Sequence, residues 1–234
     1  MKNKSQKRKK VFISILSISI FIILTIIYLT VQNIIMQRKL SNEVEKLTSM
    51  DIMTDRYEVK VSTRGDYAKV EKAIKQYLKD YSESLQMVIN ILNDEKLKKV
   101  LSASNYKEDG PEFITTSSYL EKTQKDFNDN MNQLIKLTKK TEIMKYIEKE
   151  NLDDYYVNLY REYMLDEGLE TNIKNSQLQL EATTKSINNL INVDIEVISF
   201  LKETKDNWTV EEEKIVFYKQ ELLDKYNELV SKVN

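Results

Sequence analysis

The segment 11–31, VFISILSISIFIILTIIYLTV, contains no charged residue, glycine or proline over 21 consecutive positions. As an α-helix it would be roughly 31 Å long, which matches a bilayer hydrocarbon core of about 30 Å. Apolar runs of only about 10 to 14 residues are typical of buried helices in soluble proteins. The sequence therefore predicts a transmembrane helix, to which we assign residues 11–35. The expected anchoring side chains are Val11, Phe12, Ile13, Ile15, Leu16, Ile18, Ile20, Phe21, Ile22, Ile23, Leu24, Ile26, Ile27, Leu29 and Val31.

The charges beside this segment predict its orientation. Six cations lie within the tail 1–10, whereas only Arg38 and Lys39 follow close behind the segment. The positive-inside rule then places the tail in the cytoplasm and the rest of the chain outside. A cleaved signal peptide would have a shorter apolar core and a site with small residues, and the run into VQNIIMQRKL offers neither. We expect an uncleaved, single-pass signal anchor in the cell membrane of a bacterium.

The composition excludes several classes of function. The chain has no cysteine and no histidine, which removes disulfides, thiol nucleophiles, imidazole bases and thiolate or imidazole metal sites. Beyond the tail, 30 basic residues stand against 37 acidic ones, a balance that disfavours nucleic acid. No phosphate-binding loop or nucleophile elbow occurs. We expect a protein that is not an enzyme and has no cofactor and no metal site.

The chain beyond the anchor has the pattern of long amphipathic helices. Three glycines and one proline in 234 residues, with 31% charged residues, favour an all-α fold. A stripe from Ile34 to Leu47 predicts that the membrane helix continues into a stalk, and residues 36–65 are assigned to this stalk and a connector. The connector is expected to be irregular or to contain a short strand. Residues 66–234 are predicted to form an elongated antiparallel bundle of about four long helices and one short helix, with coiled-coil pairing between subunits as an alternative.

The stripes predict individual helices within 66–234. The first has apolar residues at Val70, Ile74 and Tyr77, continues toward Leu101, and ends before the Gly110-Pro111 turn. A second is expected from about residue 115 to 147, a short one over 152–166, and a third long helix after that. The last helix is predicted to begin near Thr209, which has capping-box spacing to Glu212. The alternative is a hairpin that pairs 208–210 with 215–217 before the helix resumes.

The tyrosines of the short helix form the one candidate partner surface. Tyr155, Tyr156, Tyr160 and Tyr163 offer large ring faces with polar tips, which suit a glycan or a partner helix. Their spacing of three and four residues also suits packing inside a bundle, with two rings in the core and two at its edge. The packing interpretation is the favoured one.

Several pairs of acidic residues have the composition of catalytic or metal-binding sites but not their spacing. Asp126 and Asp129 lie in DFNDN, and Asp194 stands two residues before Glu196. The first pair lacks the glycine and the closing glutamate of a calcium loop. In a chain with so many charges, such neighbours are expected on solvated helix faces.

The C-terminal block carries a resemblance. Trp208 is followed by Ile215-Val216-Phe217 and then by ELLDKYN at 221–227. This block resembles membrane-anchored helical-bundle proteins of uncharacterised function from Gram-positive bacteria. Those proteins often have a glycine-containing turn before the Ile-Val-Phe run, where this chain has Glu211 to Glu213, and the departure disfavours the hairpin.

Together these features predict a non-enzymatic interaction or scaffold module at the cell envelope. Its expected partners are the membrane and either another envelope protein or a second copy of itself, with no nucleic acid. An extracytoplasmic ligand-binding sensor that works with a separate signalling partner is the alternative, and an envelope hydrolase is less favoured.

Overall fold

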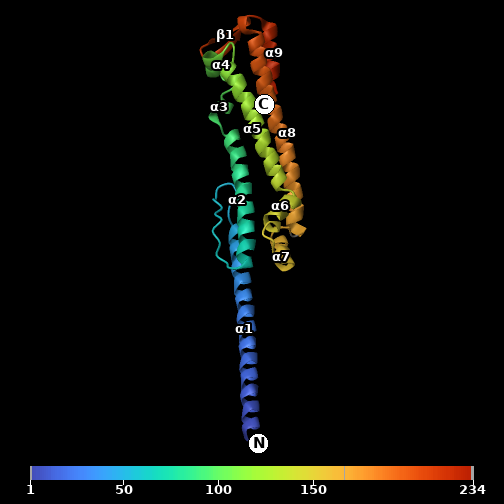
Figure 1. Ribbon diagram of the computed structural model, residues 1–234. Helices are drawn as coiled ribbons and strands as arrows, with labels where there is room; N and C mark the ends of the chain where they lie inside the picture. Colours follow the sequence, from blue (N-terminus) through green and yellow to red (C-terminus); the bar gives the residue numbers. More distant parts are fainter. Residues whose placement is uncertain (1, 166, 233–234) are drawn as a thin grey trace.

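The chain forms an elongated and mostly helical molecule in the computed structural model (Figure 1). The structure describes the backbone of residues 2–165 and 167–232, and the side chains of 24–25, 27–165, 171 and 174–232. Much of the predicted membrane segment, up to residue 23 and at Ile26, therefore has side chains outside the described part. Among the described residues, no helix is both long enough and apolar enough to cross a membrane.

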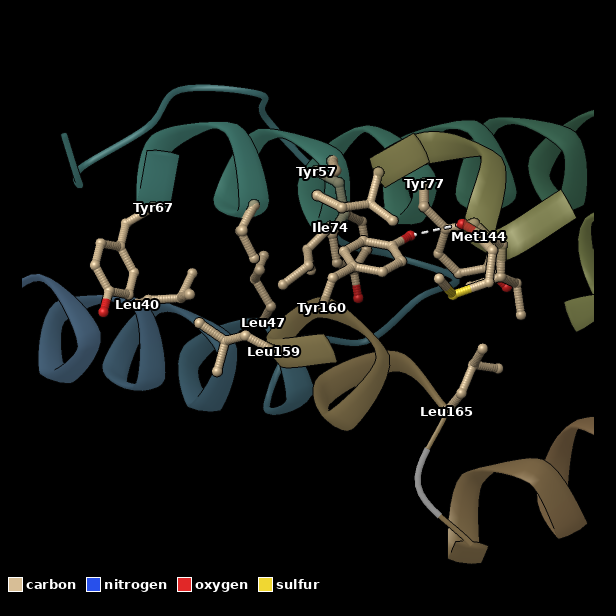
Figure 2. Close-up of a cluster of buried hydrophobic side chains, with 14 of the residues drawn as sticks. Leu40, Leu47, Tyr57, Tyr67, Ile74, Tyr77, Met144, Leu159, Tyr160 and Leu165 are labelled. Atoms are coloured by element: carbon tan, nitrogen blue, oxygen red, sulfur yellow. Dashed lines mark hydrogen bonds between the residues drawn. The ribbon is translucent and has the colours of Figure 1, made fainter. Parts of the chain in front are cut away.

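Helix α1 spans Lys2–Thr48 without a break, as the stripe through the stalk predicted, and its N-terminal part projects away from the rest of the molecule (Figure 1). The connector 49–65 is irregular, with no strand, and brings the chain back so that α2 (Asp66–Leu92) runs alongside the end of α1. The two helices are parallel, since Glu43 meets Lys75 while Leu40 lies beside Tyr67 (Figure 2). The antiparallel bundle was predicted for residues 66–234 alone, so the packing of the stalk end of α1 against α2 adds a helix that the prediction left outside the bundle.

Three long helices form the body of the domain. Helix α5 (Ile114–Leu137) lies between α2 and α8 (Glu167–Glu203) and is antiparallel to both (Figure 1). Two hydrogen bonds show that α5 is antiparallel to α2. Tyr77 of α2 donates to the Leu137 carbonyl at the end of α5, and Tyr119 near the start of α5 donates to Asp94, just after α2. Two amide pairs, Gln124 with Asn192 and Asn188 with Asn128, connect α5 to α8.

Shorter helices fill the ends of the domain, and here the sequence-based boundaries were partly wrong. The first stripe breaks after α2 into α3 (Glu95–Lys98) and α4 (Ala103–Asp109). The second predicted helix, 115–147, breaks at Thr138. Helix α6 (Lys140–Glu148) is therefore a separate helix before α7 (Asp154–Met164). Asp94 and Ser102 accept hydrogen bonds from the first turns of α3 and α4, which explains why new helices start there.

The C-terminal block forms the hairpin, not a helix from Thr209. Strand β1 (Trp208–Glu211) pairs with β2 (Lys214–Phe217) in the register Trp208 with Phe217, after a short 3-10 turn η1 (Lys205–Asn207). Helix α9 (Gln220–Ser231) follows and packs against α8. Glu212 and Glu213 take left-handed φ angles of 45° and 63°, so glutamates occupy the turn positions that usually favour glycine or asparagine. The absence of glycine therefore misled the prediction.

Three apolar clusters follow one another along the domain. One joins α1, α2, α6 and α7, a second joins α2, α5 and α8 around Phe127 and Met131, and a third surrounds Trp208 between α4, α5, α8 and α9. In the third cluster, the Trp208 ring stacks on Phe113 and its Nε1 donates to the Leu201 carbonyl at 2.8 Å. The hairpin is thus held by its tryptophan at the end of the domain far from the free part of α1 (Figure 1).

Gly110 gives a test of this third cluster. A Cβ atom at Gly110 would overlap the Tyr106 carbonyl oxygen and lie 2.9 Å from the Trp208 ring. We expect Gly110→Ala to lower the free energy of unfolding by about 3 kcal/mol, because backbone and ring must both shift. Chemical unfolding of the full chain in detergent, followed by circular dichroism, measures the change.

The matched control is Gly65→Ala. Gly65 has a φ of 61° but no atom within 4 Å of the added Cβ, so only backbone strain of about 1 kcal/mol is expected. Equal losses for the two variants would contradict the packing described around Gly110.

Candidate functional site at the junction of α1 and α2

The last turns of α1 are built into the first apolar cluster of the domain. Leu40, Val44 and Leu47 follow one another at intervals of four and three residues, which places them on one side of the helix. Leu40 is fully buried and Leu47 is 7% exposed. Figure 2 shows Leu40 beside Tyr67 and Leu47 near Ile74 and Leu159. This end of α1 is therefore part of the core, unlike the stretch that precedes it.

A buried cation connects α1, α2 and the connector. The Lys75 Nζ lies 2.7 Å from Glu43 Oε2 on α1 and 2.7 Å from Glu71 Oε1 on α2. It also donates to the Lys60 carbonyl at 2.7 Å. The side chain of Lys75 is 7% exposed and that of Glu71 is 1% exposed. We call Glu43, Glu71 and Lys75 the junction triad.

The second oxygen of Glu71 secures the connector. Glu71 Oε2 accepts hydrogen bonds from the Thr63 amide at 2.9 Å and the Thr63 hydroxyl at 2.7 Å. The Ser62 amide donates to both carboxylate oxygens, at 2.9 and 3.0 Å. A buried carboxylate is tolerated only when its oxygens are satisfied in this way. The returning chain is thereby held against α2 before the helix begins.

The protonation states follow from these contacts. Burial by itself would raise the pKa of Glu71, but hydrogen bonds from Lys75, Thr63 and Ser62 outweigh it and leave the pKa below its usual value. Burial would lower the pKa of Lys75, but the hydrogen bonds and charges of Glu43 and Glu71 raise it above its usual value. Both shifts favour the charged forms, so Glu71 is anionic and Lys75 is cationic at neutral pH.

The candidate tyrosines of α7 are divided between core and edge. Tyr160 is fully buried, and its hydroxyl donates to the Ile143 carbonyl at 2.9 Å (Figure 2). Tyr163 is partly buried against the same cluster. Tyr156 is partly buried too, whereas Tyr155 is 52% exposed. A partner surface drawn from these four would consist mainly of Tyr155.

Tyr67 of α2 completes the group at the edge. Its ring meets that of Tyr156 edge to face at 5.1 Å, and its hydroxyl lies 3.2 Å from the Tyr155 hydroxyl. Tyr155 and Tyr156 also meet edge to face at 5.1 Å. Sequence reasoning missed Tyr67, although it lies three residues before Val70 and so continues the stripe of α2 backwards.

The paired acids do not form a joint site. Asp126 and Asp129 each pair with the lysine four residues earlier, on the exposed side of α5. Glu196 contacts Lys232, whereas burial raises the pKa of Asp194 to about 6. Within the described residues, no group of three or more acidic side chains is placed to hold a metal ion.

The surface beside the junction triad is hollowed. A cleft of about 450 Å³ lies between α1 and the connector, and Lys75 lines it together with Glu43, Arg56 and Glu58. Leu47, Met50 and Val61 also line it, but most of its lining side chains are charged, whereas small-molecule sites are usually lined mainly by apolar and aromatic ones. The arrangement is suited to holding α1 in one orientation relative to the domain.

The triad predicts a pH-dependent loss of stability in Glu71→Gln. Because the folded pKa of Glu71 is lowered, its contribution is present above the unfolded value of about 4.3 and is lost as the pH falls through the folded value. At pH 7 we expect the variant to lose about 2 to 3 kcal/mol of unfolding free energy. Unfolding of the full chain in detergent between pH 3 and pH 8 measures it, and the difference between the two proteins should narrow as the pH falls below about 4.3.

Glu83→Gln is the control, since Glu83 forms the same kind of pair with Lys79 but is 57% exposed. Its loss should stay within about 0.5 kcal/mol. A constant difference between Glu71→Gln and the unaltered chain from pH 3 to pH 8 would rule out the charged form of the triad.

Comparison of the chain with family models, with curated proteins and with solved structures finds no match. The resemblance of the C-terminal block to membrane-anchored helical-bundle proteins stays a prediction.

Proposed function

We propose that the protein is a single-pass membrane anchor that presents a rigid helical interaction module outside the cell. Helix α1 has large apolar side chains that are exposed just before the junction. The exposed residues are Leu24, Ile27, Tyr28, Leu29, Val31, Ile34 and Ile35. Six of these seven fall within about 120° of the helix circumference, and Leu29 lies on the other side. The run 11–31 has no charged residue on any face, so a protein surface docked on one face would still leave apolar side chains in water.

The bilayer is the environment that suits such a segment. Leaving a large apolar side chain in water rather than burying it costs about 1.5 to 3 kcal/mol. The sequence before Leu24 continues the apolar run back to Val11 and ends in the cationic tail. The length of this run and the charge asymmetry support a span with the N-terminus in the cytoplasm.

The junction triad is the single observation that carries the proposal of a presentation role. A flexible tether would suffice to keep a domain at the membrane, yet α1 enters the domain core and ends in a buried ion pair. This arrangement fixes both the height and the rotation of the domain about the anchor. Fixed rotation matters when one face must meet a partner that is itself embedded in the envelope, either another protein or a second copy of the chain.

Helix α8 offers such a face. Most of its described residues from 174 to 190 are exposed, and Leu178 is 57% exposed. Polar amides and hydroxyls dominate this stretch, which favours a contact that is specific rather than broadly apolar. The face lies along the side of the domain, so its direction depends on the rotation of α1 (Figure 1).

An insertion experiment tests the presentation role. One residue inserted after Gln37 would rotate the domain by about 100° relative to the anchor, whereas seven would nearly restore the rotation. A photocrosslinking amino acid at Leu178 reports the partner in intact cells. We expect the crosslinked product in the unaltered chain, its loss with one added residue and its return with seven.

Topology is checked in the same cells, because the chain has no cysteine of its own. Ser118→Cys should react with a membrane-impermeant maleimide in intact cells, and Ser5→Cys only after permeabilisation. Reaction in the opposite order would overturn the orientation. If the yield of crosslinked product is the same with one and with seven added residues, α1 serves only as a tether and the presentation role is overturned.

A further inference from the structure

Tyr155, the exposed tyrosine of α7, lies at the end of the domain from which α1 emerges. Figure 1 shows α7 and the start of α2 at this end, beside the projecting part of α1. Tyr67, Tyr155 and Tyr156 contact one another here through their rings and through the hydroxyls of Tyr67 and Tyr155. We call these three residues the tyrosine end cluster.

The height of the cluster above the apolar part of α1 follows from the helix itself. Tyr67 lies beside Leu40 (Figure 2), and Leu40 follows the last exposed apolar residue of the run, Ile35, by five positions. At 1.5 Å per residue, this separation is roughly 7 Å along the helix axis. The headgroup region on each side of a bilayer is about 5 to 8 Å thick. The cluster therefore lies at headgroup level when the span is 11–35, about 37 Å of helix that tilts to fit the core and has Ile35 at its edge.

Contacts within the protein explain only part of the cluster. Tyr67 is 3% exposed and Tyr156 is partly buried, so the domain itself covers them. Tyr155 remains 52% exposed, although its hydroxyl is already partnered by Tyr67. Its free ring surface is thus available to an environment that is apolar on one side and wet on the other. Tyrosine is enriched at membrane interfaces for this reason.

The charges near the cluster are compatible with a headgroup layer. Asp66 is paired with Lys69 at 2.9 Å, Asp153 and Asp154 are exposed at the start of α7, and Arg64 is exposed two residues before the start of α2. Both signs are present, so the end of the domain does not carry a large field of one sign. A zwitterionic surface such as phosphatidylcholine can therefore approach it without strong repulsion.

We propose that the tyrosine end cluster rests on the lipid headgroups, so that the domain contacts the membrane surface at a second place besides α1. The inference rests on the proposed membrane anchoring. It adds a lipid-binding surface, with Tyr155 as the residue that enters the interface. Contact at two places would resist tilting of the elongated domain about its anchor.

Fluorescence quenching in nanodiscs tests this contact. The full chain with Tyr155→Trp is reconstituted in phosphatidylcholine nanodiscs, with or without bromine on the acyl chains near the headgroup. Trp208, the one native tryptophan, is buried at the far end of the domain and supplies a constant background. We expect the bromine to remove most of the emission that the new tryptophan adds.

Tyr218→Trp is the matched control, because Tyr218 is 64% exposed but follows β2 at the far end. Its added emission should be unaffected by bromine. A second variant inserts seven residues after Gln37 into the Tyr155→Trp chain, which lifts the cluster by about 10 Å with little rotation. Quenching should then disappear.

The outcomes separate this inference from the proposed anchoring. A chain that assembles with nanodiscs, but whose Tyr155→Trp emission behaves like that of Tyr218→Trp, overturns the lipid contact and leaves the anchor intact. Quenching that persists after the seven-residue insertion also overturns it, because contact would not depend on the height set by α1. A chain that does not assemble with nanodiscs overturns the anchoring and the inference together.

Discussion

The buried ammonium of Lys75 is the interaction on which the arrangement of this molecule depends. It is held by carboxylates from two helices, Glu43 on α1 and Glu71 on α2, and by the Lys60 carbonyl of the connector. Losing one of the two carboxylates leaves the buried ammonium with a single acidic partner, at a cost of about 2 to 3 kcal/mol. The pair therefore specifies how α1 meets the domain, because a shifted or rotated α1 would lose Glu43 from the set.

The rest of the domain extends from this point in one direction. The apolar clusters continue from the junction through α2, α5 and α8 to the hairpin and α9, and each is formed by neighbouring helices. A rotation imposed at α1 is therefore carried by packed helices over the length of the domain. The face of α8 around Leu178 and the exposed ring of Tyr155 take their positions from the same junction.

Helical periodicity predicted the elements that are long and regular. The apolar stripe of Val70, Ile74 and Tyr77 predicted α2, and the apolar residues before Leu47 predicted the continuation of α1. The Gly110-Pro111 pair predicted the turn before α5. These follow from local spacing alone. The packing interpretation of the α7 tyrosines was also sound for Tyr160, since its spacing from Tyr156 is that of a buried stripe.

Features that depend on long-range contacts could not be predicted. Glu71 and Lys75 have the i, i+4 spacing of an ordinary exposed pair, and only the return of the connector buries them. The hairpin was disfavoured because Glu212 and Glu213 stand where glycine is expected, yet Trp208 stabilises it through its contacts with Phe113 and Leu201. The parallel pairing of α1 and α2 likewise requires a connector that the sequence describes only as irregular.

Rigid coupling between α1 and the domain is the central claim, and an interspin distance tests it most directly. Spin labels at Asn42→Cys and Lys72→Cys, both exposed positions, report the distance between α1 and α2 in the full chain. We predict one narrow distance distribution that broadens when Lys75→Met removes the buried cation. A broad distribution in the parent chain, or one that stays equally narrow without Lys75, would contradict this prediction.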